Sequence, residues 1–77
     1  MRLPSLSSKH IIRALRKAGF TEAPECGKGS HRAFVKRDAG GRMRLVIVPY
    51  GKDIPRGTLL AILEQAGLTR EDFIVLI

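Results

Sequence analysis

The first pattern of apolar and polar residues along the chain is helical. Ile11, Leu15 and Ala18 recur at positions i, i+4 and i+7, so they lie on one face of a helix while charged side chains cover the rest. The pattern predicts an amphipathic helix over residues 8–18, with a serine at its start to cap the first amides. Gly19 follows and predicts the end of this helix, because glycine readily takes the left-handed conformation found there.

The middle of the chain changes to the pattern of strands. Residues 45–48 are apolar and rich in β-branched side chains, which predicts a strand over residues 43–48 that is apolar on both faces and that Pro49 ends. Residues 31–36 predict a second strand, and the glycine-rich residues 38–41 predict the hairpin turn that joins the two. Residues 20–25 are short and mixed, and their proline is suited to an edge strand or its end.

Helical spacing returns in the last third of the chain. Apolar residues on one face predict a helix over residues 55–66, which Gly67 ends. Thr69 is suited to cap a last short helix, with acidic side chains near the positive end of its dipole. The side chains expected to dock this helix on the core are Phe73, Leu76 and Ile77.

The predicted order of elements is therefore α-β-β-β-α with a terminal helical turn, which is an α+β fold. Three antiparallel strands would have one face covered by two helices and the other face open. A chain of 77 residues is too short for two cores, so residues 1–77 are expected to form a single domain.

Charge is unevenly distributed along the sequence. The chain has 14 Lys and Arg against 7 Asp and Glu, a formal net charge of +7. Residues 1–56 hold thirteen basic and four acidic side chains, whereas residues 57–77 hold one basic and three acidic. Binding of a polyanion gains free energy from counterion release, so the basic part of the chain favours a nucleic acid over the alternative of a merely charged surface.

Several classes of protein are disfavoured by the remaining composition. Cys26 is the only cysteine, so no disulfide can form within the chain, and two histidines with one cysteine make a zinc cage improbable. Both features are typical of a protein in a reducing cytosol. No apolar run approaches the roughly 20 residues that span a bilayer, and residues 1–5 lack the apolar stretch of an export signal.

The segment that follows Gly27 is the first candidate for chemistry. A histidine side chain gives or takes a proton near neutral pH, and His31 is flanked by the cations Lys28, Arg32 and Lys36. RNA carries its own nucleophile, the 2′-hydroxyl group, so a base, a proton source and cations that hold the phosphate are enough to cleave it. The alternative is that this histidine only contacts solvent or a carbonyl group.

Other polar residues give weaker signals. His10 lies among cations on the first helix and is interpreted as a solvated side chain. Cys26 is interpreted as structural, although its positive surroundings would also suit a reactive thiol. Tyr50 either stacks on a nucleobase or shields the edge of the sheet. Residues 27–30 lack the frame of a nucleotide-binding P-loop, and the carboxylates show no paired spacing for a metal.

Taken together, five blocks of the sequence resemble the HicA family of toxin mRNA interferases. The blocks follow one another over nearly the whole chain and are residues 11–20 (IIRALRKAGF), 29–34 (GSHRAF), 48–49 (VP), 53–59 (DIPRGTL) and 62–69 (ILEQAGLT). The resemblance implies a double-stranded-RNA-binding-domain-like fold. It also implies cleavage of mRNA without a metal or other cofactor, and neutralisation by a HicB-type antitoxin.

The resemblance further implies roles for residues at matching positions. The catalytic histidine of the family falls in the GSH motif, which makes His31 the expected catalytic residue. Many family members carry a second histidine shortly after the Val-Pro pair, whereas here Pro49 is followed by a shortened loop without one. Apart from the resemblance, the charge predicts that the open side of the domain is basic and holds single-stranded RNA. The residues expected to bind it are Lys28, Gly29, Ser30, Arg32, Lys36 and Lys52.

The sequence thus predicts a cytoplasmic endoribonuclease toxin that is monomeric alone and hetero-oligomeric with its antitoxin. A non-catalytic RNA-binding module of the same fold is the alternative. A third interpretation is an inactive toxin retained as half of a DNA-binding complex with its antitoxin.

Overall fold

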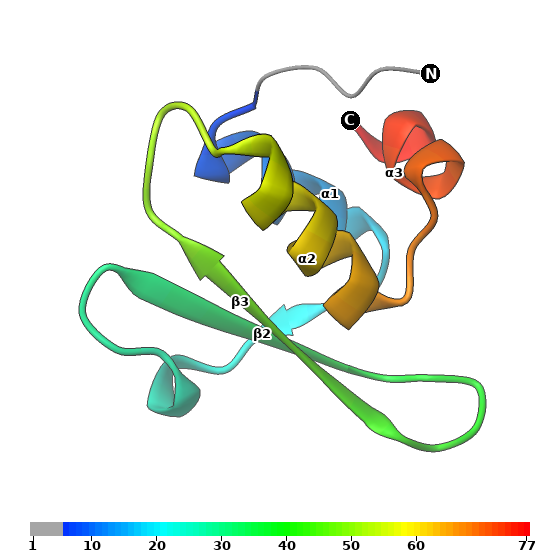
Figure 1. Ribbon diagram of the computed structural model, residues 1–77. Helices are drawn as coiled ribbons and strands as arrows, with labels where there is room; N and C mark the ends of the chain where they lie inside the picture. Colours follow the sequence, from blue (N-terminus) through cyan, green and yellow to red (C-terminus); the bar gives the residue numbers. More distant parts are fainter. Residues whose placement is uncertain (1–5) are drawn as a thin grey trace.

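In the computed structural model, which describes residues 6–77, the helices lie on one side of a small antiparallel sheet (Figure 1). The interpretation of residues 1–5 as lacking an export signal lies outside this range. The elements in chain order are α1 (Ser8–Lys17), β1 (Thr21–Glu22), the 3-10 helix η1 (Pro24–Cys26), β2 (His31–Arg37), β3 (Met43–Pro49), α2 (Arg56–Ala66) and α3 (Arg70–Leu76). This order confirms the α+β prediction and agrees with a double-stranded-RNA-binding-domain-like fold.

The sheet has the order β1-β2-β3, and each neighbouring pair is antiparallel. The β2–β3 hairpin sets the register, in which His31 lies opposite Pro49 and Arg37 lies opposite Met43. The predicted turn closes the hairpin, since the amide of Asp38 donates to the Arg42 carbonyl oxygen at 2.8 Å.

The first strand is shorter than the sequence suggested. Only Thr21–Glu22 pairs with β2 as a strand, although residues 20–25 were candidates. Pro24 begins the 3-10 helix η1, because proline lacks the N–H that a strand would need and fixes its own φ angle. The segment around η1 packs against β2, and Ala33 is fully buried although it points away from the helices. The face opposite the helices is therefore partly covered.

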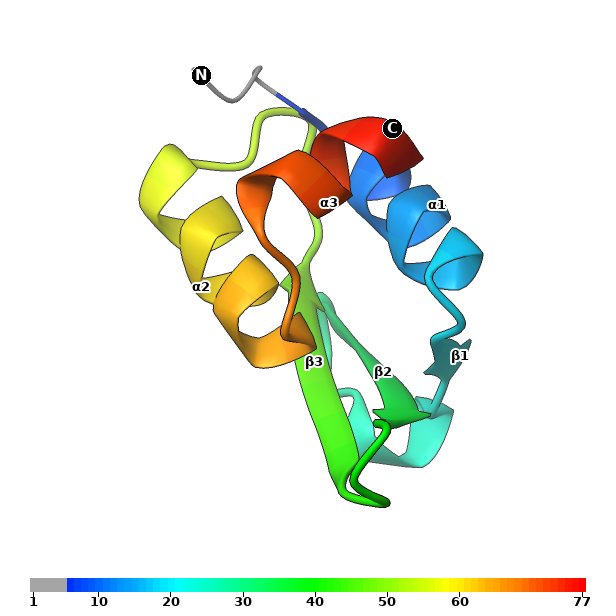
Figure 2. The same cartoon turned by 90° about the vertical axis from the view of Figure 1, so that its right-hand side faces the viewer.

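The core fills the space between the sheet and the helices. Phe34 and Val46 from the sheet are fully buried, as are Ile11 and Leu15 from the predicted face of α1. Figure 2 shows α1 and α2 on the same side of the sheet with α3 between them. The other core side chains include Val48, Leu59, Ile62, Leu63 and Phe73.

The two C-terminal helices begin and end where local signals placed them. Gly67 ends α2 with a left-handed φ of 71°. Thr69 caps α3 through its hydroxyl oxygen, which accepts from the Asp72 amide at 3.0 Å, and the Asp72 carboxylate accepts from the Thr69 amide at 3.1 Å. The bond from the Thr69 backbone lowers the pKa of Asp72. Of the side chains predicted to dock α3, Ile77 does not do so, because it follows the last helical residue and is 43% exposed.

None of the helices within residues 6–77 combines the length and apolar character that crossing a membrane requires.

Candidate active site around His31

His31 is the first residue of β2 and is exposed to solvent. A tight turn precedes it, in which the amides and carbonyl oxygens of Lys28 and His31 exchange two hydrogen bonds of 3.0 Å each. Gly29 stands first of the two central residues and has a φ of 58°, as in the two-residue hairpin turns that place glycine there. The turn therefore fixes the backbone of Lys28 beside that of His31, at the open end of the β2–β3 hairpin.

Gly27 holds this turn close to β2. A Cβ atom on Gly27 would lie 3.0 Å from the carbonyl oxygen of His31, a backbone atom that cannot move away cheaply. The glycine therefore permits the chain to approach the strand that carries His31.

The His31 imidazole has no hydrogen-bond or ion-pair partner among residues 6–77. On the neighbouring strand, Pro49 lies opposite it, and the amide of Tyr50 donates to the Ser30 carbonyl oxygen at 2.8 Å. Both ring nitrogens are therefore available to a ligand, while the backbone on either side is fixed by hydrogen bonds.

Arg32 and Lys36 do not join His31. Side chains alternate between the two faces of a strand, and Phe34 points into the core beneath the helices. Arg32 and Lys36 share the face of Phe34, whereas His31 lies on the opposite face. Lys36 donates through Nζ to the carbonyl oxygen of Ala18, the residue that caps the end of α1.

Arg32 is engaged by a carboxylate that the sequence analysis did not single out. Its Nε and Nη2 atoms donate to the two carboxylate oxygens of Glu22 at 2.9 and 2.6 Å. The hydrogen bond from Arg32 lowers the pKa of Glu22, and the charges of Arg32 and Arg16 add to the effect. The same pair raises the pKa of Arg32. Glu22 thus compensates part of the positive charge of Arg16 and Arg32 on this side of β2.

Replacing Glu22 with glutamine should increase the affinity for single-stranded RNA. The substitution keeps the shape of the side chain but leaves the charges of Arg16 and Arg32 uncompensated. The slope of log affinity against log salt should steepen by about 0.7 for each additional phosphate that the protein neutralises. Fluorescence anisotropy with a labelled oligonucleotide at several salt concentrations measures both quantities. Glu71→Gln removes the same charge from α3 and is the control, and an equal gain in both variants would contradict a local effect.

The open face of the sheet differs from the basic surface that was expected. Between His31 at one end and Arg37 at the other, this face presents mainly apolar side chains. Two of them are strongly exposed, Met43 at 58% and Leu45 at 46%, while Val35 and Ile47 are half-buried. The open face is mainly apolar because side chains alternate along β2, which places Arg32 and Lys36 on the helical face.

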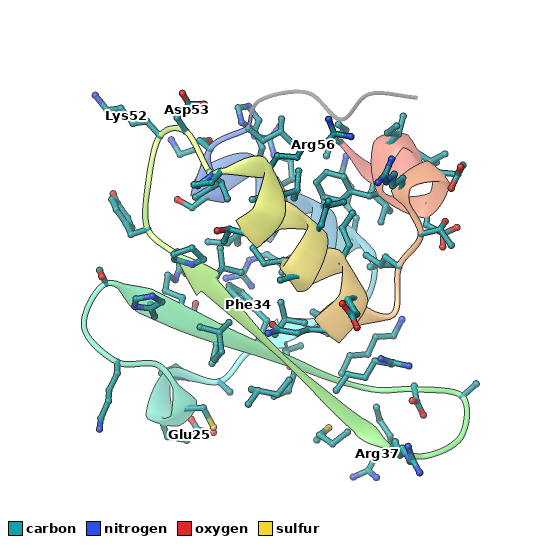
Figure 3. All side chains as sticks on the ribbon, in the orientation of Figure 1. Glu25, Phe34, Arg37, Lys52, Asp53 and Arg56 are labelled. Atoms are coloured by element: carbon teal, nitrogen blue, oxygen red, sulfur yellow. The ribbon has the colours of Figure 1, made fainter. Side chains whose placement is uncertain are left out.

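The remaining predicted RNA-binding residues lie in the turn before β2 and in the loop after β3. Lys28, Gly29 and Ser30 form the turn itself and are exposed. Lys52 lies in the loop after β3, and its side chain extends outward from that loop in Figure 3, whereas Phe34 points toward the helices. The site therefore combines His31 with the exposed Lys28 of its own turn, whereas Lys52 stands on a separate loop, and no row of cations runs beside His31 along β2.

The other candidates have roles that fit their surroundings. The Nδ1 atom of His10 lies 2.9 Å from the Ser7 hydroxyl oxygen at the start of α1, so this ring is part of the helix terminus and is not simply solvated. Cys26 is a free thiol, exposed on η1 rather than packed in the core. Within residues 6–77, no three His, Cys, Asp or Glu side chains gather in a way that could hold a metal ion.

Comparison with models of protein families identifies the family of this chain. The model of a family described as the HicA toxin of bacterial toxin-antitoxin systems matches residues 8–68, which include α1, the whole sheet and α2. A comparison with curated proteins found no match.

Proposed function

Because this chain belongs to the HicA family of bacterial toxins, we propose that it is an endoribonuclease that cleaves mRNA with His31 as its catalytic residue. In this proposal the reaction needs no metal ion, and a HicB-type antitoxin inhibits it. The toxin acts in the cytoplasm, where its mRNA substrate is found.

The observation that carries the proposal is the placement of His31. The imidazole is exposed, unpartnered among residues 6–77, and held on backbone that two hydrogen bonds to Lys28 fix. A general acid–base group must reach the proton that it transfers, and a solvent-facing ring at the end of a strand meets this requirement. A histidine kept for packing would instead be buried.

The chemistry follows from the substrate's own nucleophile. The His31 imidazole accepts the proton of the ribose 2′-hydroxyl group while the 2′-oxygen attacks the adjacent phosphorus atom. The bond from phosphorus to the 5′-oxygen breaks, and the imidazolium donates its proton to that oxygen. The products are a 2′,3′-cyclic phosphate and a free 5′-hydroxyl group.

Cations next to the imidazole stabilise the charge that builds on the phosphate. Lys28 lies on the same turn, since its backbone pairs with that of His31, and Lys52 lies on the loop after β3. The turn residues Gly29 and Ser30 offer backbone that a phosphate can approach closely. Arg32 and Lys36 face the helical side of β2, where Glu22 and the end of α1 hold them, so in this proposal they bind neighbouring phosphates of the RNA and not the one at His31.

The antitoxin inhibits by covering His31. A partner on this face would also bury the apolar side chains that continue from His31 along the sheet, such as Ile47 and Leu45. Such a contact should survive salt that removes RNA, because buried apolar area is far less sensitive to salt than phosphate contacts are. Alone, the toxin is monomeric.

Incubation of the purified chain with RNA in the presence of EDTA tests the activity. We expect cleavage to continue in the chelator and to leave 2′,3′-cyclic phosphate ends. RNA of the same sequence with 2′-O-methyl groups is the control, since it lacks the nucleophile and should stay intact. If the RNA also stays intact with free 2′-hydroxyl groups but shifts in a salt-dependent way, the chain is a binding module instead.

A further inference from the structure

Tyr50 is the most exposed aromatic side chain of the described residues and lies beside His31 in the fold. Its side chain is 77% exposed, so the ring covers little of the sheet edge and the shielding role considered for it does not apply. The ring borders two adjoining grooves of about 250 and 180 Å³ between α1 and the end of β3. An aromatic ring left in water at the border of two grooves is suited to stack on a planar ligand.

The backbone that carries Tyr50 is fixed on both sides. Its amide donates to the Ser30 carbonyl oxygen at 2.8 Å, in the turn next to His31. The following residue, Gly51, accepts hydrogen bonds from the amide and the hydroxyl group of Ser8 at 2.9 and 3.1 Å. The loop is further tied by Ile54, whose amide donates to the Leu6 carbonyl oxygen at 2.8 Å. The backbone that carries the ring therefore needs little ordering when a ligand binds.

The grooves beside the ring are positively charged. Lys9 and Lys52 border the larger groove, and neither ammonium group has a hydrogen-bond or ion-pair partner within residues 6–77. Lys9 also borders the smaller groove, together with Arg32. Among residues 6–77, no acidic side chain borders either groove. Two free ammonium groups beside an exposed ring match a phosphate attached to an aromatic base, which is the chemistry of a nucleotide.

We infer that Tyr50, Lys9 and Lys52 form a nucleotide subsite, in which one unpaired base of a single RNA strand stacks on the ring and a neighbouring phosphate contacts the lysines. The inference rests on the proposed function for its substrate class. It adds that the RNA strand crosses the open end of the β2–β3 hairpin, from His31 on the open face of the sheet to Tyr50 on the helical side. Because every base has a π-face, the subsite favours unpaired RNA over duplex with little choice of base.

The chain itself supplies the probe for this stacking. It has one tyrosine and no tryptophan, so its intrinsic emission reports on Tyr50 alone. A short 2′-O-methyl RNA, which binds without being cleaved, should quench this emission. An abasic oligonucleotide of equal length and inorganic polyphosphate should bind through the lysines and leave the emission nearly unchanged. Equal quenching by all three ligands, or no quenching by RNA that anisotropy shows to be bound, would overturn the inference.

Substitutions give a second, independent measurement. Tyr50→Ala should lower the affinity for the base-containing oligonucleotide by about 5- to 160-fold, the range measured for loss of one base–aromatic stack, and should leave the affinity for the abasic one unchanged. Tyr50→Phe should bind both as the wild type does. Val75→Ala, on an exposed position of α3, is the control for a general surface change. Equal losses for the two oligonucleotides in Tyr50→Ala would contradict the stacking contact.

These outcomes separate the inference from the proposed activity. Quenching and a base-dependent loss in a chain that never cleaves RNA would leave the subsite standing and reject the endoribonuclease. If instead the chain cleaves RNA and Tyr50→Ala changes neither KM nor kcat, the endoribonuclease activity stands and the subsite is rejected. If Tyr50→Ala weakens only the antitoxin contact, the grooves belong to a protein partner and the inference is wrong.

Discussion

Replacement of His31 by alanine is expected to lower the rate of RNA cleavage by about 10²- to 10⁴-fold, the usual contribution of a general acid–base group. The fold should survive, since the imidazole is exposed and has no partner within residues 6–77. The backbone bonds between His31 and Lys28 and the pairing with Pro49 do not need the side chain. Affinity for 2′-O-methyl RNA should change little. Single-turnover cleavage together with thermal unfolding measures both effects.

The chain offers its own matched control in its second histidine. His10 lies at the start of α1 and contacts Ser7, so His10→Ala should cost some helix stability and leave the cleavage rate near that of the wild type. Lys28→Ala should behave differently from both, with a lower rate and an intact fold, because it removes a phosphate contact and not the proton carrier. A His31→Ala protein that still degrades message as fast as the wild type would reject His31 as the catalytic residue.

Local signals made most of the fold predictable. A glycine after α2 and a threonine before α3 act through contacts within a few residues, so they could be identified without any knowledge of the rest of the chain. The hairpin was predictable for the same reason, because residues 38–41 and the apolar strand beside them are adjacent in sequence. β1 was harder to bound, because only two residues pair and Pro24 redirects the chain at once.

The site was predictable only in part, because its contacts are distant in sequence. His31 was identified from its motif, and its neighbours Lys28 and Ser30 follow from the turn. The period of two along β2 separates His31 from Arg32, but choosing the face requires knowing that Phe34 is the residue that enters the core. The pairing of Arg32 with Glu22 depends on how β1 lies beside β2, and the bonds between Ser8 and Gly51 span 43 positions. No local pattern encodes either contact.

The two faces of β2 therefore have different roles. Because the side chains of both faces project from the same backbone, their positions are coupled. Its open face starts with His31, the group available for chemistry. Its helical face carries Phe34, whose ring packs beneath the helices while the guanidinium groups of Arg16 and Arg32 lie 5.6 Å from its centre. The position of His31 thus depends on the packing of a residue three positions away that points in the opposite direction.

Replacement of Phe34 by alanine should destabilise the protein by about 3–5 kcal/mol, the usual range for truncating a buried phenylalanine. A domain of this size has a total stability of roughly 4–12 kcal/mol, so a large part of it would be lost. Chemical unfolding followed by circular dichroism measures the change, with Val75→Ala as an exposed control that should shift it by less than about 0.5 kcal/mol. Activity should fall in proportion to the unfolded fraction. A ligand that binds only the folded state should restore this activity by mass action. The same ligand should not restore the activity of His31→Ala, because that variant stays folded. If Phe34→Ala unfolds at the same denaturant concentration as the wild type, the sheet and helices do not depend on this ring, and the rigid coupling of the two faces of β2 is wrong.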